Sequence, residues 1–279
     1  MSPIVLSQPS CVEIWRDAVR AVDEAPGHEA HNVVLTVQDP TTGAQLTDKR
    51  VALVEDFLQP FEKSVRTIAN TIFPMSLYRR HGAPEFFDAF HERVLPTVRR
   101  NYRWSGYYFE RMTDWPGAPN GNPLWDIVTR MRDPKVRSNN KFELALFDPA
   151  RDVSRAPYGG QCLSFLSFKL MPGHPKTVAL TAFYRNHYYI EKLLGNLVGL
   201  GQLMAFVASE TDQKVGPLTV ISSHAVIDLP GKNGGASSTR ADVRALLDQY
   251  DALPQAVDQA NSANGSVASA VAAGVGTKS

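Results

Sequence analysis

Cys162 is the residue of this sequence best placed to act as a nucleophile. It follows the turn-like segment Tyr158-Gly159-Gly160-Gln161 and opens an amphipathic stretch, so a strand could present it to a cleft. A cysteine attacks as its thiolate, and a free thiol has a pKa of about 8.5, so a cation is needed nearby. Arg185 ends the next predicted strand and could reach back over the first one. A core cysteine beside a surface arginine is the alternative that spacing leaves open.

His224 is a second possible partner for Cys162. It stands in Ser222-Ser223-His224, and a cysteine with a histidine can form a nucleophile–base pair. A histidine that ends a strand explains the same residue without chemistry. The remaining histidines do not stand at metal-ligand spacing with paired acids or thiolates, so no metal site is predicted.

Two hairpin strands and a long apolar helix are expected to position these residues. Residues 161–170 and 177–185 alternate in polarity, and the turn-rich segment 171–176 joins them, which indicates a hairpin. Residues 187–209 are apolar nearly all round and predict a buried helix. Gly195, Gly199 and Gly201 fall inside that helix, where they do not form a phosphate-binding loop and are expected to permit close packing.

The other predicted elements are strands, recognised by alternating polarity or short apolar runs, and helices, recognised by apolar residues at helical spacing. Strands are expected at 32–37, 141–147 and 218–227, and helices at 48–72, 83–98 and 123–132. Pro60 is expected to bend or split the first of these helices, and Pro96 to weaken the second. Strands that pair sequentially, with helices interspersed rather than strictly alternating, indicate an α+β fold.

The chain is expected to divide into one large domain and a small C-terminal part. Residues 1–229 form the domain, 230–259 a glycine-rich connector with a helix capped by Thr239, and 260–279 a flexible tail without aromatic residues.

Composition excludes several classes of protein. The chain has 279 residues and a formal net charge of +1, which argues against a general nucleic-acid binder and a polybasic membrane anchor. The longest apolar stretch, 188–208, is broken by Glu191, Lys192, Asn196 and Gln202, so no membrane span is expected. No signal peptide is evident, and two distant cysteines form no disulfide framework, so a cytoplasmic protein is expected.

The order of these segments resembles the second half of thymidylate synthase. That family reads Pro-Cys-His, Tyr-Gln-Arg-Ser-x-Asp, Leu-Gly-x-Pro-Phe-Asn-Ile-Ala and Gly-Asp-x-His-x-Tyr. This chain has Gln161-Cys162-Leu163, Tyr184-Arg185-Asn186, Gly195-Asn196-Leu197, and then Gly216 with Ser223-His224. From Arg185 to Asp228 the two patterns align without a gap, and weaker similarity extends back to about residue 101.

The resemblance implies a fold and a role for each matching residue. The fold would be a mixed sheet covered by helices, with a buried central helix. Cys162 would add to C6 of a pyrimidine, beside Tyr108 or Tyr107; Arg185 would bind phosphate and favour the thiolate; and Asn196 would read the ring edge, favouring uracil over cytosine. The further candidates are His224 for catalysis, Gln161, Asn186 and Asp228 for substrate, and Arg137 and Lys141 for phosphate across a subunit boundary.

The activity so implied is transfer of a one-carbon unit, methyl or hydroxymethyl, to C5 of a pyrimidine nucleotide. Methylene-tetrahydrofolate would be the one-carbon donor, and the protein would be a homodimer packed through its sheets.

Departures from the family pattern support a second interpretation. Leu163, Tyr188 and Val226 replace residues that the family uses, Asp228 stands in place of a tyrosine, and the closing C-terminal segment is absent. These changes are also compatible with a non-catalytic protein that keeps the fold and binds a nucleotide or a partner. A third interpretation uses Cys162 and His224 for an unrelated transfer.

Overall fold

The computed structural model describes residues 3–45, 47–100, 107–115, 117–153, 161–231, 235 and 237–253. It divides the chain into two compact units, Met1–Ser238 and Thr239–Ser279. The predicted tail, 260–279, lies outside the described residues.

The first unit is built on a mixed sheet, and this confirms the α+β class. Its described strands are β1 (Val5–Gln8), β2 (Glu29–Val37), β3 (Glu143–Ala145), β4 (Leu163–Met171), β5 (Thr177–Tyr184), β6 (His187–Tyr188) and β7 (Lys214–Val226). They run in the order β1-β2-β7-β5-β4-β3, with β6 beside β7. The pairs β1–β2 and β5–β7 are parallel, whereas β2–β7, β4–β5 and β3–β4 are antiparallel.

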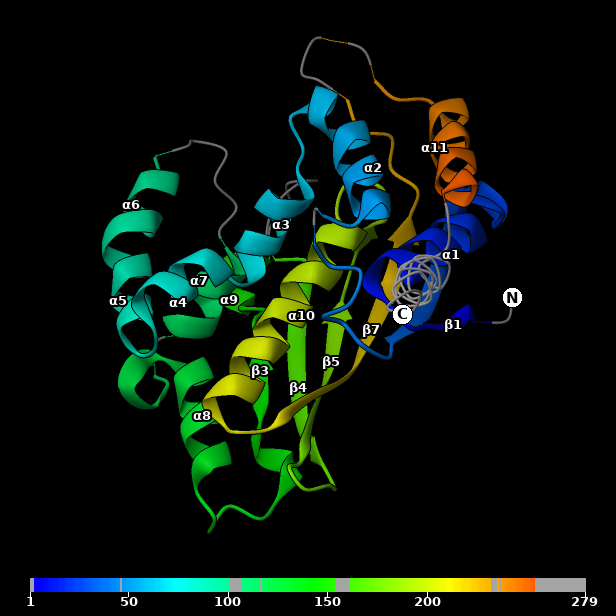
Figure 1. Cartoon of the computed structure of the whole chain (residues 1–279). Helices are drawn as coiled ribbons and strands as arrows, with labels where there is room; N and C mark the ends of the chain where they lie inside the picture. Colours follow the sequence, from blue (N-terminus) through cyan, green and yellow to red (C-terminus); the bar gives the residue numbers. More distant parts are fainter. Residues whose placement is uncertain are drawn as a thin grey trace, which may run out of the picture. The chain divides into compact units, whose positions relative to one another are not determined.

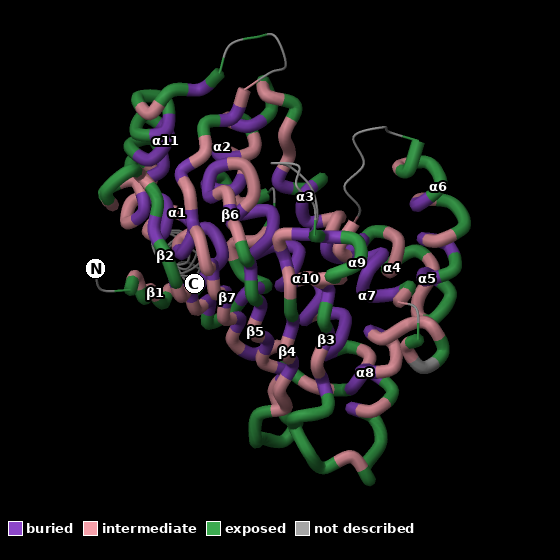
Figure 2. Tube along the Cα trace, turned by 180° about the vertical axis from the view of Figure 1, so that it is seen from behind, coloured by how far each residue is buried: buried purple, intermediate pink, exposed green. Residues whose placement is uncertain are grey.

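Helices cover one face of this sheet, with α10 lying across β4 and β5 (Figure 1). The described α-helices of the unit are α1 (Cys11–Asp23), α2 (Lys49–Leu58), α3 (Val65–Ile72), α4 (Met75–His81), α5 (Glu85–Ala89), α6 (Leu95–Val98), α7 (Tyr108–Thr113), α8 (Pro123–Arg132), α9 (Pro149–Asp152) and α10 (Leu193–Glu210). Seen from behind, β4, β5 and β7 have no described helix of this unit in front of them (Figure 2).

The buried helix α10 packs closely through its glycines, as predicted. A Cβ at Gly195 would stand 2.6 Å from Cβ of Ile68, and one at Gly201 would stand 2.2 Å from the carbonyl oxygen of Pro40. Nearly the whole of α10 is buried, including the polar Asn196. The helix is apolar enough to span a membrane, but 78% of its length is buried inside the fold, as in the core helix of a soluble protein.

Most predicted elements of the first unit are confirmed. The hairpin β4–β5 forms in antiparallel register, and α8 occupies 123–132 as expected. The split at Pro60 occurs as a 3-10 turn, Gln59–Phe61, between α2 and α3. The predicted helix 83–98 forms α5 and α6 with a π-turn between them, and Pro96 lies in the first turn of α6, where a missing N–H costs little.

Four predicted boundaries are wrong, and long-range pairing explains three of them. The strand predicted from 32 begins at Glu29, because residues 29–31 pair with β7. The helix predicted from 187 begins at Leu193, because His187 and Tyr188 pair with β7 and the backbone N–H groups of the next two residues donate to Asp228. The strand predicted from 218 begins at Lys214, because its first residues pair with Thr177 and Val178. The strand predicted over 141–147 is limited to β3, because residues 139–141 form a 3-10 turn.

The sequence does not predict β1, α1, α4, α7 or α9 of the first unit. Ser10 caps α1 by accepting the backbone N–H of Glu13. In the second unit, α11 (Arg240–Ala252) begins at the predicted cap, Thr239, which forms a capping box with Asp242.

Candidate active site

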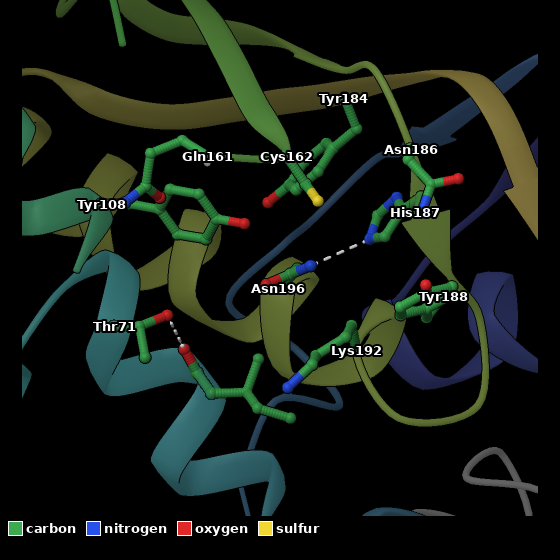
Figure 3. Close-up of a pocket in the computed structure, with 11 residues that line it drawn as sticks. Thr71, Tyr108, Gln161, Cys162, Tyr184, Asn186, His187, Tyr188, Lys192 and Asn196 are labelled. Carbon is green, nitrogen blue, oxygen red and sulfur yellow. Dashed lines mark hydrogen bonds between the residues drawn. The ribbon is translucent and has the colours of Figure 1, made fainter. Parts of the chain in front are cut away.

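A cavity of about 200 Å³ opens at the N-terminal end of α10 (Figure 3). Five predicted site residues line it: Tyr108, Gln161, Cys162, Asn186 and Asn196. Six further residues complete the described lining: Ile68, Thr71, Tyr184, His187, Tyr188 and Lys192. The cavity therefore brings together segments that are far apart in the sequence.

Cys162 lies immediately before β4 and is partly exposed to this cavity. Burial raises the pKa of its thiol, while the charges of Arg185 and Lys192 lower it. The net direction is upward, so the thiol is predominantly protonated at neutral pH in the free protein. Nucleophilic attack from this position therefore needs further stabilisation of the thiolate when a ligand binds.

Arg185 reaches back over the first hairpin strand, as predicted. Its backbone N–H donates to the carbonyl of Cys162, and its Nε donates to the carbonyl of Gln161, both at 3.0 Å. The guanidinium lies 5.7 Å from the ring centroid of Phe147. The side chain is exposed and is not part of the cavity lining. It therefore influences Cys162 through its charge rather than by sharing the cavity wall.

Two tyrosines stand beside Cys162, and both keep neutral hydroxyls. Burial raises the pKa of Tyr108 and of Tyr184 above the ordinary value. Their rings meet edge to face with centroids 6.4 Å apart. The Tyr184 side chain is 0% exposed, and its hydroxyl has no hydrogen-bond partner among the described residues. Both residues can act as hydrogen-bond donors toward the cavity side of Cys162.

A chain of buried polar side chains supports Asn196. Its Nδ2 lies 2.9 Å from Nε2 of His187, and Nδ1 of His187 lies 3.0 Å from Oγ of Ser222. The hydroxyl of Tyr189 donates to the same Oγ at 3.2 Å. Burial lowers the pKa of His187 to about 3, so its ring is neutral. That ring stacks on Tyr184 with centroids 4.0 Å apart.

Lys192 adds a cation to the cavity wall directly before α10. Its side chain is 38% exposed, and Nζ lies 3.9 Å from Oε2 of Glu191, too long for a strong ion pair. Burial is the main cause that lowers the pKa of Lys192, and the charge of Lys63 adds to it. The amine is therefore more readily deprotonated than an ordinary lysine.

Tyr184, His187 and Lys192 line the cavity but are not predicted as site residues from the sequence. One signal is present for Lys192, because it is a charge within an otherwise apolar stretch that precedes a buried helix. No comparable local signal marks His187, whose role depends on pairing between β6 and β7.

Four other predicted site residues do not line the cavity. His224 lies on β7, where Nδ1 contacts Oδ1 of Asn186 at 2.8 Å and Nε2 contacts Oε2 of Glu29 at 3.2 Å. His224 is therefore connected to the cavity by its contact with Asn186, which lines it. Asp228 accepts the backbone N–H groups of Ile190 and Glu191 at 2.8 and 3.1 Å. Arg137 and Lys141 are exposed between α8 and β3.

Comparison with known proteins assigns no family to this chain. No family model matches it, and no curated protein is similar to it. Within the part of the chain that the structure describes, no group of three or more histidine, cysteine, aspartate or glutamate side chains is arranged to hold a metal ion.

Proposed function

We propose that this protein is a thymidylate synthase-like transferase that adds a methyl or hydroxymethyl group to C5 of a pyrimidine nucleotide. One observation carries the proposal: Cys162, Tyr108 and Asn196, which the sequence resemblance aligns with functional residues of that family, line a single cavity. A nucleophile, a neutral donor beside it and an amide that can read a ring edge are what addition to a pyrimidine requires.

The chemistry begins when the thiolate of Cys162 forms a bond to C6 of the ring. The electron pair of the C5–C6 double bond moves toward the C4 carbonyl oxygen, which makes C5 nucleophilic. C5 would then bond to the one-carbon unit as the bond between that unit and its donor breaks, and C5 would lose its proton to a base. Water added to the one-carbon unit would give hydroxymethyl, and a hydride that the donor would also supply would give methyl, as the C5–C6 double bond re-forms and the Cys162 thiolate leaves. The charge of Arg185 favours the thiolate.

Lys192 is the residue proposed to accept the C5 proton. The described lining contains no carboxylate, and His187 engages Asn196 and Ser222 through its two ring nitrogens. A lowered pKa increases the fraction of Lys192 that is neutral and able to take a proton.

Methylene-tetrahydrofolate is the donor that the family resemblance implies. The lining fits such a group, since Ile68 and Tyr188 offer apolar and aromatic surface in the cavity that holds Cys162. When bound, the donor supplies the one-carbon unit. The residues of this chain bind and orient the nucleotide and move its protons.

The surrounding assignments follow from the same proposal. Arg185 binds the phosphate beside Cys162, and Arg137 and Lys141 serve the site of a second subunit in a homodimer. Gln161, Asn186 and Asp228 hold or support the substrate, and His224 acts through Asn186. The protein is proposed to work in the cytoplasm on free nucleotides, without nucleic acid, membrane or metal.

A non-catalytic nucleotide-binding protein is the second candidate, and one observation favours it. Burial raises the pKa of Cys162 despite two nearby cations, which is the direction that favours an inert thiol. Under this alternative the cavity binds a nucleotide reversibly and forms no covalent bond.

Covalent capture separates the two candidates. The protein is incubated with 5-fluoro-dUMP or 5-fluoro-UMP, with and without methylene-tetrahydrofolate, and its intact mass is measured. Transfer chemistry predicts an adduct on Cys162 that requires the donor and is absent from Cys162→Ser. Ligand binding by calorimetry without any adduct would support the binding protein, and binding of neither nucleotide would refute both.

A further inference from the structure

Lys192 is the only amine in the described lining of the cavity, and it stands directly before α10. Its side chain is 38% exposed, so a small molecule from solvent can reach Nζ. In Figure 3 Lys192 lies on one side of Asn196 and Cys162 lies on the other. The described lining contains no carboxylate. The cavity therefore holds an accessible amine that no acid of its own wall neutralises.

The charges around Lys192 favour its neutral form. Oε2 of Glu191 lies 3.4 Å from Nζ of Lys63 and 3.9 Å from Nζ of Lys192. The carboxylate is therefore engaged first by Lys63, which places a second positive charge near Lys192. Burial, the main cause, and the charge of Lys63 lower the pKa of Lys192 more than its acidic neighbours raise it. A lysine that is desolvated and next to another cation is the form that attacks carbonyl carbons.

Two neutral phenols in the same lining can serve the proton transfers of such an attack. Burial raises the pKa of Tyr108 and of Tyr184, so both hydroxyls keep their protons. The Tyr184 side chain is fully buried, and its hydroxyl has no hydrogen-bond partner among the described residues. A carbonyl oxygen that enters the cavity can accept a hydrogen bond from such a hydroxyl, which would otherwise remain unsatisfied.

The size and charge of the cavity limit the carbonyl compound that it can enclose. Its volume is about 200 Å³, and an apolar cavity of about 150 Å³ holds benzene. A compound with roughly six non-hydrogen atoms therefore fits inside, whereas a nucleotide would extend through the opening. An aldehyde has one substituent on its carbonyl carbon where a ketone has two, so it needs less room. The described lining holds no second cation to bind an acid group, which favours an uncharged aldehyde.

We propose that Lys192, activated by Lys63, forms an imine with a small uncharged aldehyde in this cavity. The lone pair of Nζ attacks the carbonyl carbon, and the electron pair of the C=O double bond moves to the oxygen. One proton of the amine passes to that oxygen and gives a carbinolamine. The second proton follows, the oxygen leaves as water, and the nitrogen lone pair completes the C=N bond. Tyr108 or Tyr184 relays these protons and ends unchanged.

This inference goes beyond the proposed function, because imine formation needs neither a nucleotide nor a one-carbon donor. The two activities share one group, since the neutral amine that would accept the C5 proton is the amine that attacks the aldehyde. While the imine is present, Lys192 cannot act as that base.

The first experiment measures the reactivity of each lysine in the full-length wild type. The protein is incubated at pH 7 with propionaldehyde and sodium cyanoborohydride, which reduces an imine to a stable secondary amine. Peptide mass mapping at low conversion gives the rate at each lysine. Lys135 and Lys176 are exposed and report the reactivity of ordinary lysines. A hemithioacetal formed reversibly at Cys162 is not retained by this reduction.

Lys192 should be alkylated about tenfold or more faster than these exposed lysines, because more of its amine is neutral. Its rate should also saturate at aldehyde concentrations where the rates at Lys135 and Lys176 still rise in proportion, because only Lys192 lies in a cavity that holds the aldehyde. A rate at Lys192 no greater than at the exposed lysines would overturn the proposal. A fast rate that never saturates would also overturn it, since a reactive amine without an aldehyde site behaves in that way.

The second experiment tests activation by the neighbouring cation. Lys63→Gln removes the charge that competes for Glu191, so alkylation of Lys192 at pH 7 should slow by about two- to tenfold. Lys169→Gln is the matched control, because Lys169 also pairs with a glutamate, Glu143, and does not line the cavity. This control should leave the rate at Lys192 unchanged. Equal rates in Lys63→Gln and the wild type, or equal slowing in both variants, would overturn the proposal.

Neither experiment includes a nucleotide, so the outcome is separate from that of covalent capture at Cys162. Failure of aldehyde labelling leaves the proposed transferase standing, and failure of nucleotide capture leaves the imine site standing.

Discussion

At the scale of single residues, the reactivity of Cys162 is a balance between burial and two positive charges. Burial raises its pKa and the cations Arg185 and Lys192 lower it. The balance can be measured without knowing the substrate, because alkylation by iodoacetamide follows the thiolate fraction. Cys11 provides a clean background, since its side chain is fully buried.

Removing either cation should raise the pKa of Cys162 further. We expect Arg185→Gln and Lys192→Gln each to slow alkylation at pH 7.5 by about two- to tenfold, with the pH–rate profile moved to higher pH. The larger effect should come from Arg185, the stronger of the two influences. Cys162→Ser gives the rate of Cys11 alone, and an unmoved profile in both variants would show that neither charge reaches the thiol.

The buried carboxyl of Asp228 should make the stability of the folded protein depend on pH. Burial raises the pKa of its carboxyl to about 6, from an ordinary value of 3.8. The folded protein therefore binds more protons than the unfolded chain between these values, so the contribution of Asp228 is greatest at low pH and is lost as pH rises through 6. Asp228→Asn should abolish this dependence.

Urea unfolding at pH 4, 5, 6 and 7 measures the effect. The free energy of unfolding of the wild type should fall relative to that of Asp228→Asn by on the order of 1–3 kcal/mol across this range. Parallel curves for the two proteins would mean that the carboxylate is ionised equally in the folded and unfolded states.

The sequence can predict those site residues whose positions follow from the succession of neighbouring strands and helices along the chain. Cys162 and Arg185 are predicted from the order of the two hairpin strands, and Asn196 from the resemblance of the following helix to thymidylate synthase. His187 and Tyr184 are not, because their roles arise from a stacked pair and a hydrogen-bond chain that β7 completes from 35 residues away. Long-range pairing of this kind leaves no periodic signal.

At the scale of elements, α10 is the support of the cavity, and its glycines set how closely it approaches α3. A Cβ at Gly199 would stand 2.8 Å from the carbonyl oxygen of Ala69, which is backbone and has little room to move. In an ordinary helix interior, replacing glycine by alanine stabilises by about 0.5–1 kcal/mol. At Gly199 the same replacement should destabilise the fold instead.

Gly199→Ala is therefore expected to destabilise the fold by about 1–3 kcal/mol through overpacking. The free energy of unfolding by urea gives the comparison, with Ser209→Ala, at an exposed position near the end of the same helix, as the control. The control should change stability by no more than about 0.5 kcal/mol. Stabilisation by Gly199→Ala would mean that α10 and α3 do not approach as closely as described.

Elements with a strong period of their own are predicted well from the sequence, and those that depend on distant partners are not. The hairpin, α8 and the capped α11 carry local signals of alternation, helical spacing or capping. The segment 187–192 continues an apolar run, so its sequence favours a helix. Pairing with β7 and two hydrogen bonds to Asp228 make it extended instead.

At the scale of the whole molecule, the uncovered face of the sheet bears on the proposed homodimer. Phe165 and Phe183 are paired across β4 and β5 and are 39% and 37% exposed. Ile221 of β7 lies next to Phe183 in register, which extends the apolar row to a third strand. Exposed aromatic side chains in a row are more typical of an interface than of a solvated surface.

Phe183→Glu should break such a dimer by placing a charge in its centre. Light scattering after size exclusion would then show a monomer, whereas Lys135→Glu, at an exposed position away from this row, should leave the dimer intact. If Arg137 and Lys141 of one subunit hold the phosphate bound by the other, the monomer should also lose about tenfold or more in nucleotide affinity while its unfolding temperature changes little. A monomer that binds nucleotide as tightly as the dimer would place the whole phosphate site within one chain, with Arg185 as its main cation.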